Sequence, residues 1–325
     1  MNSDSRIRHR TARPGDIVTI QLTMTPEHGY VPDALFETSG NVSLVLGWGN
    51  FLPGLHQLIT GMSVGDSVEH QSVDAGWGAK RDELIVTVKK SNMTSLNHPE
   101  LIQVGSKLRL KPNLEVEVIS MDDESFTVDA NPPLVGTSFD CSFVIIEICS
   151  NPKDDDSSTS PYKLATFALG CFWGAELAYL RVPGVVGTKV GYTQGITIDQ
   201  PTYEDVCAGY TKHREAVLLI YDERVVPYEE LMSVAIERLQ LTAVQDQVSL
   251  FGDDSDSEQY KHGFYYHSNQ QKELASSFLA QDNQYRIELK AAAILHEAEE
   301  YHQKYLLKGG QSARKGTKDK IRCFG

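Results

Sequence analysis

The chain has 325 residues, 41% of them hydrophobic and 23% charged, and it is longer than one typical domain core of about 100 to 200 residues. This composition excludes a wholly disordered, collagen-like or coiled-coil protein. Lys and Arg number 30 against 44 Asp and Glu, and the net charge of -14 argues against a broad nucleic-acid-binding surface. We expect two folded domains in a water-soluble protein that binds no nucleic acid.

Targeting, redox and metal signals are sparse. No hydrophobic run approaches the roughly 20 residues that cross a bilayer, so no membrane partner is expected. Arginines near the start of the chain have no apolar segment behind them, which is unlike a secretory signal and favours a cytoplasmic protein. Five cysteines, an odd number, disfavour a disulfide framework. The chain has no Cys-x-x-Cys pair, and His296 and His302 lack metalloprotease spacing, so neither a metal nor a prosthetic cofactor is expected.

The first half of the chain alternates short strand-like runs with turns that contain Gly, Pro or Asp, a pattern typical of a mostly β domain. A short helix is expected after the motif GWGNFLPGL at residues 47–55. The predicted strands cover residues 18–22, 42–46, 84–88, 114–119, 126–128 and 143–148.

Several motifs of this half occur in a defined order. GWGNFLPGL is followed by VGD at residues 64–66, AGWG at 75–78 and VDANPPLVG at 128–136. The order resembles that of the FKBP-type peptidyl-prolyl isomerases, and the last motif resembles members that carry an inserted flap. The resemblance extends over residues 13–148 and implies an antiparallel β domain with a flap within about 93–128.

The same resemblance implies a pocket for proline. Such a pocket lowers the barrier to amide rotation, about 18 to 20 kcal/mol, by binding the twisted amide rather than by acid or base. Its walls would be Phe36, Glu37, Phe51, Leu52 and Trp77. Positions that depart from the family's usual residues are Leu22, Glu37, Leu55 and Cys141. We expect a weakened isomerase or, as the alternative, a catalytically inactive polypeptide-binding module.

A Pro, Asp and Ser cluster, NPKDDDSSTS, separates the two halves. We expect a linker at 150–162 between domains of residues 13–149 and 163–325, and we expect it to isolate the first domain from the second. In the second half, strand-like runs alternate with helical patterns, as in α+β or α/β proteins. The predicted strands are 164–169 and 216–221, and the predicted helices are 172–180, 228–239, 270–281 and 294–306.

A cysteine lies at the first strand-to-helix turn of the second half. Cys171 follows the predicted strand 164–169 and directly precedes the predicted helix 172–180. Unpaired amides and the helix dipole at a helix N-terminus stabilise an anion, and therefore a thiolate. This position favours a reactive thiol over a small buried core cysteine.

The motif around this cysteine, GCFWGAE at residues 170–176, resembles the signature of the type A peptide methionine sulfoxide reductases. Further motifs of that family follow in order: GYTQG at 191–195, PTY at 201–203, VC at 206–207 and HREAV at 213–217. The resemblance covers nearly all of residues 162–325 and implies a two-layer α/β sandwich. It also implies that Cys171 is the nucleophile and that Glu215, Tyr203 and Tyr260 hold the sulfoxide oxygen.

The residue types suit the chemistry. A sulfoxide sulfur becomes electrophilic only when its oxygen is protonated or strongly hydrogen-bonded, so a thiolate needs an acid nearby. Burial beside Phe172 and Trp173 would raise the pKa of Glu215 and keep it protonated near neutrality. The two aromatic rings also offer an apolar slot for the S-methyl group.

A second thiol is needed to resolve the sulfenic acid that forms on Cys171. Cys323 is the favoured partner because the Gly- and Lys-rich stretch 309–320 before it is expected to be mobile, and Cys207 is the alternative. Thioredoxin or another dithiol would then reduce the disulfide. Of the family's His-Asp-Pro-Thr segment only the Thr is kept here, as Thr242. The next family motif contains an Asp whose position falls near Ser255 in this chain, and no single residue there can be assigned its role.

Taken together, these features predict a two-domain α+β fusion of an FKBP-like isomerase or chaperone with a methionine sulfoxide reductase. Its expected partners are oxidised or unfolded polypeptides and thioredoxin. A redox-sensing chaperone, in which oxidation of Cys171 signals rather than repairs, is the alternative for the whole protein.

Overall fold

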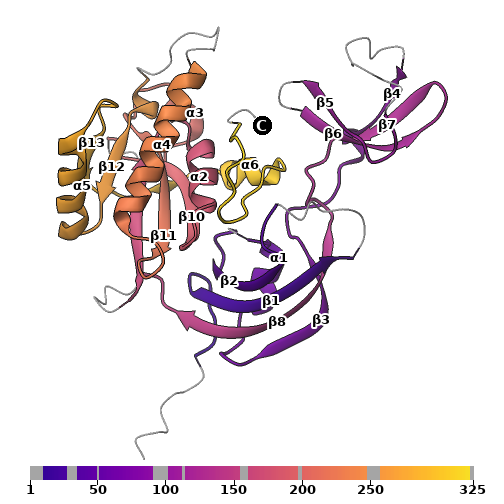
Figure 1. The fold of residues 1–325 in the computed structure, drawn as a ribbon, viewed down its shortest axis with the longest axis horizontal. Coiled ribbons are helices and arrows are strands. Elements are labelled where there is room, and N and C mark those ends of the chain that lie inside the picture. Colours follow the sequence, from indigo (N-terminus) through magenta and orange to yellow (C-terminus); the bar gives the residue numbers. More distant parts are fainter. Residues whose placement is uncertain are drawn as a thin grey trace, which may run out of the picture.

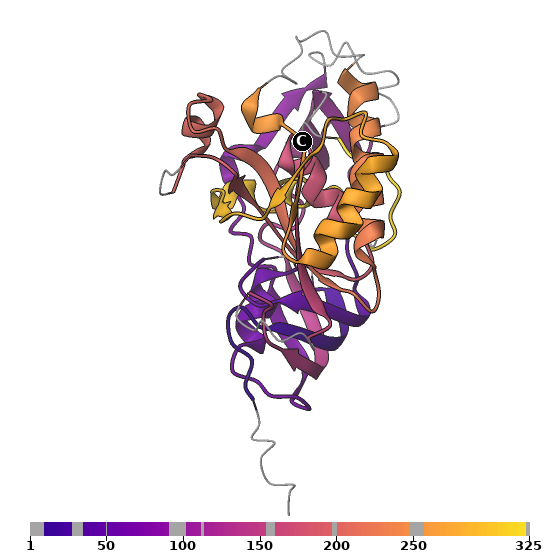
Figure 2. The same ribbon diagram turned by 90° about the vertical axis from the view of Figure 1, so that its left-hand side faces the viewer.

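The computed structural model describes residues 10–27, 35–49, 51–90, 102–111, 114–153, 160–196, 200–246 and 257–322. It has two domains of the α+β class (Figure 1). In Figure 2 the main sheet of the first domain lies below the second domain. Within the described residues, no helix is both long enough and apolar enough to span a membrane.

The main sheet of the first domain is antiparallel, with the order β2-β1-β8-β3. Its strands are β1 (Ile17–Pro26), β2 (Ser39–Val45), β3 (Ser67–Asp74) and β8 (Ser138–Cys149). Alternate residues of β1, among them Ile20, Leu22 and Met24, are buried, as expected for a sheet with one face on a core. Helix α1 (Pro53–Ile59) packs on that core and carries a proline in its first turn, where no backbone donor is lost.

A smaller sheet of the first domain stands apart from the main one (Figure 1). In the chain it lies between β3 and β8, after the 3-10 turn η1 (Asp82–Leu84), and its strand order is β4-β7-β6-β5. The strands are β4 (Ile85–Lys89), β5 (Lys107–Lys111), β6 (Leu114–Met121) and β7 (Ser125–Asp129). Val118, Phe126 and Val128 form part of a separate buried cluster, so this sheet has a hydrophobic core of its own.

The second domain has a six-stranded sheet with the order β13-β12-β9-β11-β10-β14. Its strands are β9 (Tyr162–Ala168), β10 (Val185–Thr193), β11 (Arg214–Asp222), β12 (Gly263–Tyr266), β13 (Glu288–Ala291) and β14 (His296–Glu297). Only β12 and β13 pair in parallel among the described strands of this sheet. Every residue of β11 is buried, as expected of a strand that is covered on both faces.

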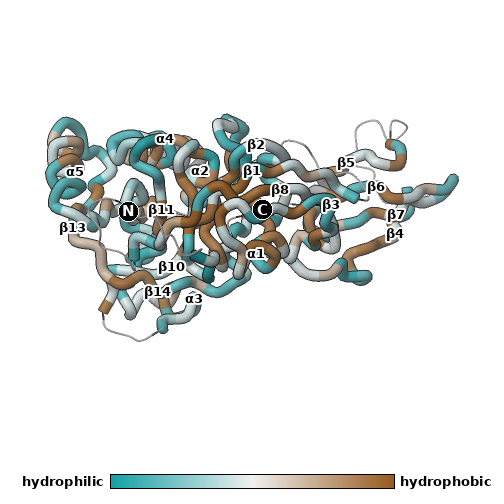
Figure 3. The backbone as a smooth tube through the Cα atoms, turned by 90° about the horizontal axis from the view of Figure 1, so that it is seen from below, coloured by the Kyte–Doolittle hydropathy of each residue, from teal (hydrophilic) through white to brown (hydrophobic). Residues whose placement is uncertain are grey.

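Three longer helices belong to the second domain, and neighbours among them pack side by side: α2 (Phe172–Leu180), α4 (Tyr228–Asp246) and α5 (Asn269–Gln281). In Figure 3, α5 carries both hydrophilic and hydrophobic stretches, which is typical of a helix at the surface. The shorter elements are α3 (Tyr203–Cys207), η5 (Glu258–Tyr260), η6 (Glu300–His302) and α6 (Tyr305–Lys308).

The helix predicted at 294–306 is wrong. This segment instead adds β14 to the edge of β10, and the Ala298 amide continues the pairing with a 3.0 Å bond to the Val190 carbonyl. The Gln303 side chain bonds both backbone groups of Val190, and Lys304 has a left-handed backbone with a φ of 54°. Unpaired backbone groups at the edge of a sheet attract a further strand, so tertiary pairing overrides the helical spacing.

Part of the stretch 309–320, which the composition predicts to be mobile, packs against the rest of the protein instead. Ser312 and Ala313 are buried. Arg181, the residue after α2, donates hydrogen bonds to the carbonyls of Ser312 and Asp319 at 2.8 and 2.6 Å. A guanidinium has five donors and can hold several carbonyls of an irregular segment, which composition alone does not reveal.

The expectation that the linker isolates the two domains is also wrong. A buried cluster contains residues of both domains: Ile17, Val45, Tyr162, Val186 and Ile220. At Gly187 of β10 an added Cβ would lie 2.6 Å from a methyl carbon of Val45, so only a glycine allows β10 to approach β2 this closely. The two domains therefore share a packed interface.

Candidate active site

The turn between β9 and α2 positions Cys171. Gly170 has a φ of 77°, a conformation that glycine adopts without strain, and it turns the chain into the helix. Cys171 is the residue that caps the N-terminus of α2, and its side chain is half-buried. The thiol therefore lies at the helix N-terminus, as the sequence predicts.

Glu215 lies on β11 beside this turn. The Phe172 amide donates a 3.0 Å hydrogen bond to Glu215 Oε2, which joins the carboxyl group to the first turn of α2. Only 1% of Glu215 is exposed, and burial raises its pKa to about 8 despite that hydrogen bond. The direction agrees with the raised pKa expected from the sequence, and with a pKa of about 8 the carboxyl group is largely protonated at neutral pH.

Two tyrosines complete the group. Tyr203 is the first residue of α3, whose start is fixed by a capping box between Thr202 and Asp205, and Tyr260 is the last residue of η5. Burial raises the pKa of both phenols, and charge on Glu215 and Cys171 raises them further. Cys171, Glu215 and the two tyrosines therefore lie close enough for charge on the first two to change the pKa values of both phenols.

The two candidate resolving cysteines differ in what can be said of them. Cys207 is exposed at the end of α3, and it lies close enough to Tyr203 to contribute to the raised pKa of that phenol. The alternative resolving thiol therefore lies beside one of the tyrosines of the site. Cys323, the favoured partner, lies outside the described residues, as does Ser255 with its neighbouring acids.

An aromatic wall adjoins the site and includes His302, for which the sequence analysis predicted no role at the site. Trp173 Nε1 donates a 3.0 Å hydrogen bond to His302 Nδ1. The His302 ring, 2% exposed, lies 5.1 Å from the ring of Phe172 and 4.8 Å from that of Tyr203, measured between centroids. His302 therefore contacts both rings of the predicted methyl slot.

Glu299 is a second residue that the sequence analysis missed. Its carboxylate accepts hydrogen bonds from the Tyr192 hydroxyl and from the Tyr203 amide, both at 2.9 Å. It thereby ties the start of α3 to β10. His302 and Glu299 were missed because both fall in the segment 294–306, which was assigned to a helix; a strand-pairing signal next to the GYTQG motif would have been needed to find them.

The pocket residues of the first domain also come together. The rings of Phe36 and Phe51 meet edge to face at 5.6 Å between centroids, and Leu52 is fully buried. Together with Glu37 and Trp77 they line a cavity of about 40 Å³. Other residues that line it belong to the second domain: Leu180, Val185, Val186, Leu307, Ala313 and Lys315. The predicted prolyl pocket therefore faces the second domain instead of open solvent.

Comparison with known proteins gives matches to both halves. The family profile described as "Peptide methionine sulfoxide reductase" matches residues 163–321, and "FKBP-type peptidyl-prolyl cis-trans isomerase" matches residues 8–71. "Peptide methionine sulfoxide reductase A4, chloroplastic" of Arabidopsis thaliana is 44% identical over 184 residues, which cover 53% of this chain and 68% of that protein. "Peptide methionine sulfoxide reductase A2-1" of Oryza sativa subsp. japonica is 44% identical over 179 residues, 54% of this chain and 92% of that protein. The chain belongs to the peptide methionine sulfoxide reductase family.

The chain is thus a fusion of an FKBP-type domain with a methionine sulfoxide reductase domain. Among solved structures, "Methionine sulfoxide reductase A of Corynebacterium diphtheriae" matches with a TM-score of 0.37 and 30% identity, covering 46% of this chain and 76% of that one. Within the described part of the reductase and its fused domain, no group of three or more His, Cys, Asp and Glu side chains could hold a metal ion.

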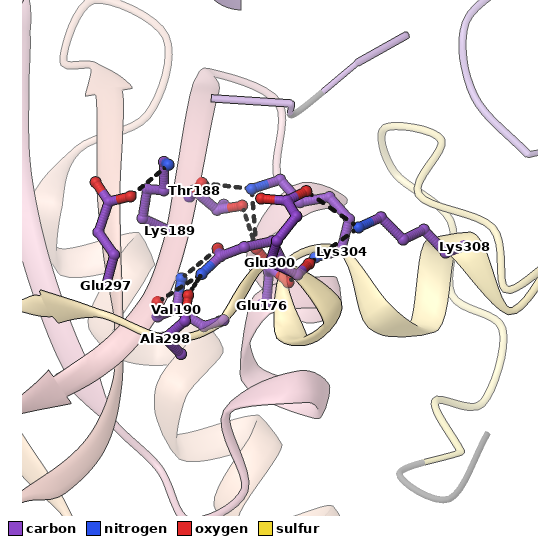
Figure 4. Close-up of polar contacts among 10 residues, drawn as sticks. Glu176, Thr188, Lys189, Val190, Glu297, Ala298, Glu300, Lys304 and Lys308 are labelled. Atoms are coloured by element: carbon purple, nitrogen blue, oxygen red, sulfur yellow. Dashed lines mark hydrogen bonds and ion pairs between the residues drawn. The ribbon is translucent and has the colours of Figure 1, made fainter. Parts of the chain in front are cut away.

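A buried ion pair connects the catalytic helix of the reductase with the segment after β14 (Figure 4). Lys304 Nζ lies 3.1 Å from Glu176 Oε1, and the Lys304 amide donates a 2.7 Å hydrogen bond to Glu176 Oε2. The Thr188 hydroxyl donates to the same carboxylate at 2.9 Å. Both charged side chains are 1% exposed, so neither can exchange its partner for water.

We expect Lys304→Met to destabilise the reductase by about 3 to 5 kcal/mol, because removal of one partner leaves the Glu176 charge buried and unpaired. Lys308→Met is the matched control, since its pair with Glu300 spans 3.4 Å at the surface and should contribute less than about 1 kcal/mol. Urea unfolding of both variants measures the difference. Equal stabilities would show that the buried pair contributes nothing.

Proposed function

We propose that the site reduces methionine S-sulfoxide in polypeptides through covalent chemistry at Cys171. The thiolate attacks the sulfoxide sulfur, and protonated Glu215 gives its proton to the sulfoxide oxygen. In the resulting adduct the hydroxyl passes from the substrate sulfur to the Cys171 sulfur, so that the substrate S–O bond and the bond between the two sulfurs both break. Cys171 is left as a sulfenic acid and methionine is released. The observation that carries this proposal is the buried Glu215, whose pKa is raised to about 8 and which bonds the amide next to Cys171.

Tyr203 and Tyr260 are proposed to hold the sulfoxide oxygen. Burial raises the pKa of both phenols, so each keeps its proton and acts as a hydrogen-bond donor. The slot for the S-methyl group is proposed at Phe172 and Trp173, with His302 fixing the indole through its 3.0 Å hydrogen bond. Donors and apolar walls together would select a polar oxygen next to an apolar methyl group.

The sulfenic acid is proposed to condense with the Cys323 thiol, releasing water and leaving a disulfide that thioredoxin or another dithiol reduces. Cys207 remains the competing thiol because it is exposed and lies near Tyr203, whose pKa it raises. We propose the domain limits 13–149 and 163–325, joined by a linker at 150–162. A cytoplasmic location stays a prediction, and one relative carries the description "chloroplastic".

We expect Cys323→Ser to complete one turnover and then stop, with Cys171 trapped as a sulfenic acid. Cys207→Ser is the matched variant and should recycle normally with thioredoxin. Peptide mapping of the oxidised wild-type protein checks this directly. A Cys171–Cys207 disulfide in that map would reverse the assignment of the two thiols.

For the first domain we propose a prolyl isomerase of reduced activity. The inserted flap is proposed to be the sheet β4-β7-β6-β5, which begins at residue 85 and therefore earlier than the expected range of about 93–128. The edge-to-face rings of Phe36 and Phe51 support an apolar site for a twisted prolyl amide. Leu22 and Leu55, both buried, stand where other members have aromatic residues, so fewer contacts to the peptide are available. A polypeptide-binding module without catalysis is the alternative.

We expect Phe36→Ala in the full chain to lower isomerase kcat/KM about tenfold, because the variant loses a ring that contacts both Phe51 and Phe139. Phe36→Leu, which keeps most of the volume, should lose less. An assay on an Xaa-Pro peptide without a coupled protease measures both. If neither wild type nor the variants isomerise the peptide faster than buffer alone, the first domain is the alternative, a polypeptide-binding module without catalysis.

For the whole protein, a redox-sensing chaperone is the competing proposal. Turnover on a peptide that contains methionine S-sulfoxide, with a dithiol present, separates the two. Repeated turnover supports repair, whereas oxidation of Cys171 without release of methionine supports signalling.

A further inference from the structure

The prolyl pocket is small and partly covered by the reductase domain in the intact chain. Its cavity of about 40 Å³ has room for a few water molecules, whereas sites that bury a ligand typically enclose about 300 Å³ or more. The residues that cover it include Leu307, Ala313 and Lys315 of the reductase domain. A prolyl residue can therefore enter only if part of the reductase moves away.

Two backbone amides of the reductase domain donate hydrogen bonds to residues at the pocket. The Ala313 amide donates a 2.8 Å hydrogen bond to the Leu35 carbonyl, and the Lys315 amide donates a 2.7 Å bond to Glu37 Oε1. Glu37 is a wall of the pocket, and Leu35 directly precedes Phe36 and Glu37. We call residues 311–315 the docking segment.

Further contacts hold the docking segment against the pocket rim. Trp77 packs against a cluster of buried reductase residues that contains Leu307 and Ala313. Just before the segment, Gly310 lies against Pro133 so closely that an added Cβ would be 3.2 Å from the proline ring. The docking segment and the residues just before it therefore contact the first domain at more than one point.

The docking segment is also bound to the catalytic helix of the reductase. Arg181, directly after α2, donates to the Ser312 carbonyl at 2.8 Å, and Lys315 Nζ donates to the Leu180 carbonyl at 2.7 Å. Trp173 of the active site packs on the same cluster as Trp77 of the pocket. The segment thus connects the prolyl pocket with the helix that begins at Cys171, and it ends eight residues before Cys323.

We propose that the prolyl pocket is the docking site of residues 311–315, so that this segment and an incoming polypeptide compete for it. The proposal rests on polypeptide binding by the first domain. A polypeptide that binds the pocket displaces the docking segment from Leu35 and Glu37, and it frees the chain that leads to Cys323. Polypeptide binding at the first domain would then affect the surroundings of Cys323, the proposed resolving thiol.

Hydrogen exchange on the wild-type full chain tests the displacement. The probe is a proline-containing peptide without methionine, added at increasing concentration. Exchange of the Ala313 and Lys315 amides should become at least about tenfold faster as the peptide saturates, and trypsin should cut faster after the exposed Arg314. Exchange that stays constant or slows while the peptide saturates would overturn the proposal.

Variants of the docking segment test the competition. Ala313→Pro removes the amide that bonds Leu35. Gly310→Ala strains a backbone with a φ of 87° and places a Cβ 3.2 Å from the Pro133 ring, next to the segment. Each should bind the peptide about tenfold more tightly than wild type, and Lys318→Ala, at an exposed position, is the control that should not. Single-turnover reduction of free methionine sulfoxide shows whether each variant is folded.

The outcomes separate this proposal from the isomerase activity. Tighter peptide binding by the variants supports docking even if no protein in the series accelerates prolyl isomerisation, in which case only the isomerase proposal fails. Folded variants that bind no more tightly than wild type would contradict docking. Absence of peptide binding by every protein would contradict it too, since no competitor for the pocket would exist.

Discussion

Cys171→Ser should abolish reduction of methionine sulfoxide. A serine hydroxyl at the N-terminus of α2 is not ionised at neutral pH and cannot form a sulfenic acid, so neither the attack nor the oxygen transfer has a route. The expected loss is the whole catalysed rate. Release of methionine from a sulfoxide peptide, followed by chromatography, measures it.

Cys149→Ser is the matched control for this prediction. Cys149 is half-buried at the end of β8, and burial raises its pKa to about 11, so its thiol stays protonated and unreactive. The control should keep full activity. Activity that persists in Cys171→Ser would show that Cys171 is not the nucleophile of the reductase.

Glu215→Gln should slow the chemical step by about 10² to 10⁴, the usual contribution of a general acid. The amide keeps the shape of the carboxyl group and can still accept the Phe172 hydrogen bond, but it has no proton to give. Thermal unfolding should therefore change little while the single-turnover rate falls. An unchanged rate would transfer the acid role to Tyr203 or Tyr260.

The pH dependence gives the same prediction a second signature. An acid must be protonated to act, and burial raises the pKa of Glu215 to about 8. The wild-type single-turnover rate should therefore fall as pH rises through about 8, where the carboxyl group loses its proton. That fall should be missing from Glu215→Gln, so a variant with the same alkaline limb as wild type would show that another group titrates.

Local patterns predict the centre of the site well. The predicted helix 172–180 has the bounds of α2, and Cys171 caps it as expected. A strand, a glycine with positive φ and a mostly buried, apolar helix follow one another within a few residues, so nothing distant is needed to place this thiol. Burial of Glu215 also follows from its place on an apolar strand, now β11.

Features that depend on distant contacts were not predictable from one sequence. His302 and Glu299 join the site only because β14 pairs with β10, and the helical spacing of 294–306 hides that pairing. The polar stretch 309–320 is ordered by Arg181 and by the first domain, neither of which is near it in the chain. The covering of the prolyl pocket by the reductase domain and the close approach of β10 to β2 at Gly187 likewise arise from packing between domains.

The central claim is that Cys171 takes the oxygen of a methionine sulfoxide and passes its oxidation to a second thiol of the same chain. A single-turnover reaction tests it most directly: the full chain is mixed with a methionine S-sulfoxide peptide without reductant, and both are analysed by mass spectrometry. We expect one equivalent of methionine per chain, together with a protein lighter by two hydrogens that carries a disulfide at Cys171. Unchanged peptide together with an unmodified Cys171 would contradict the account.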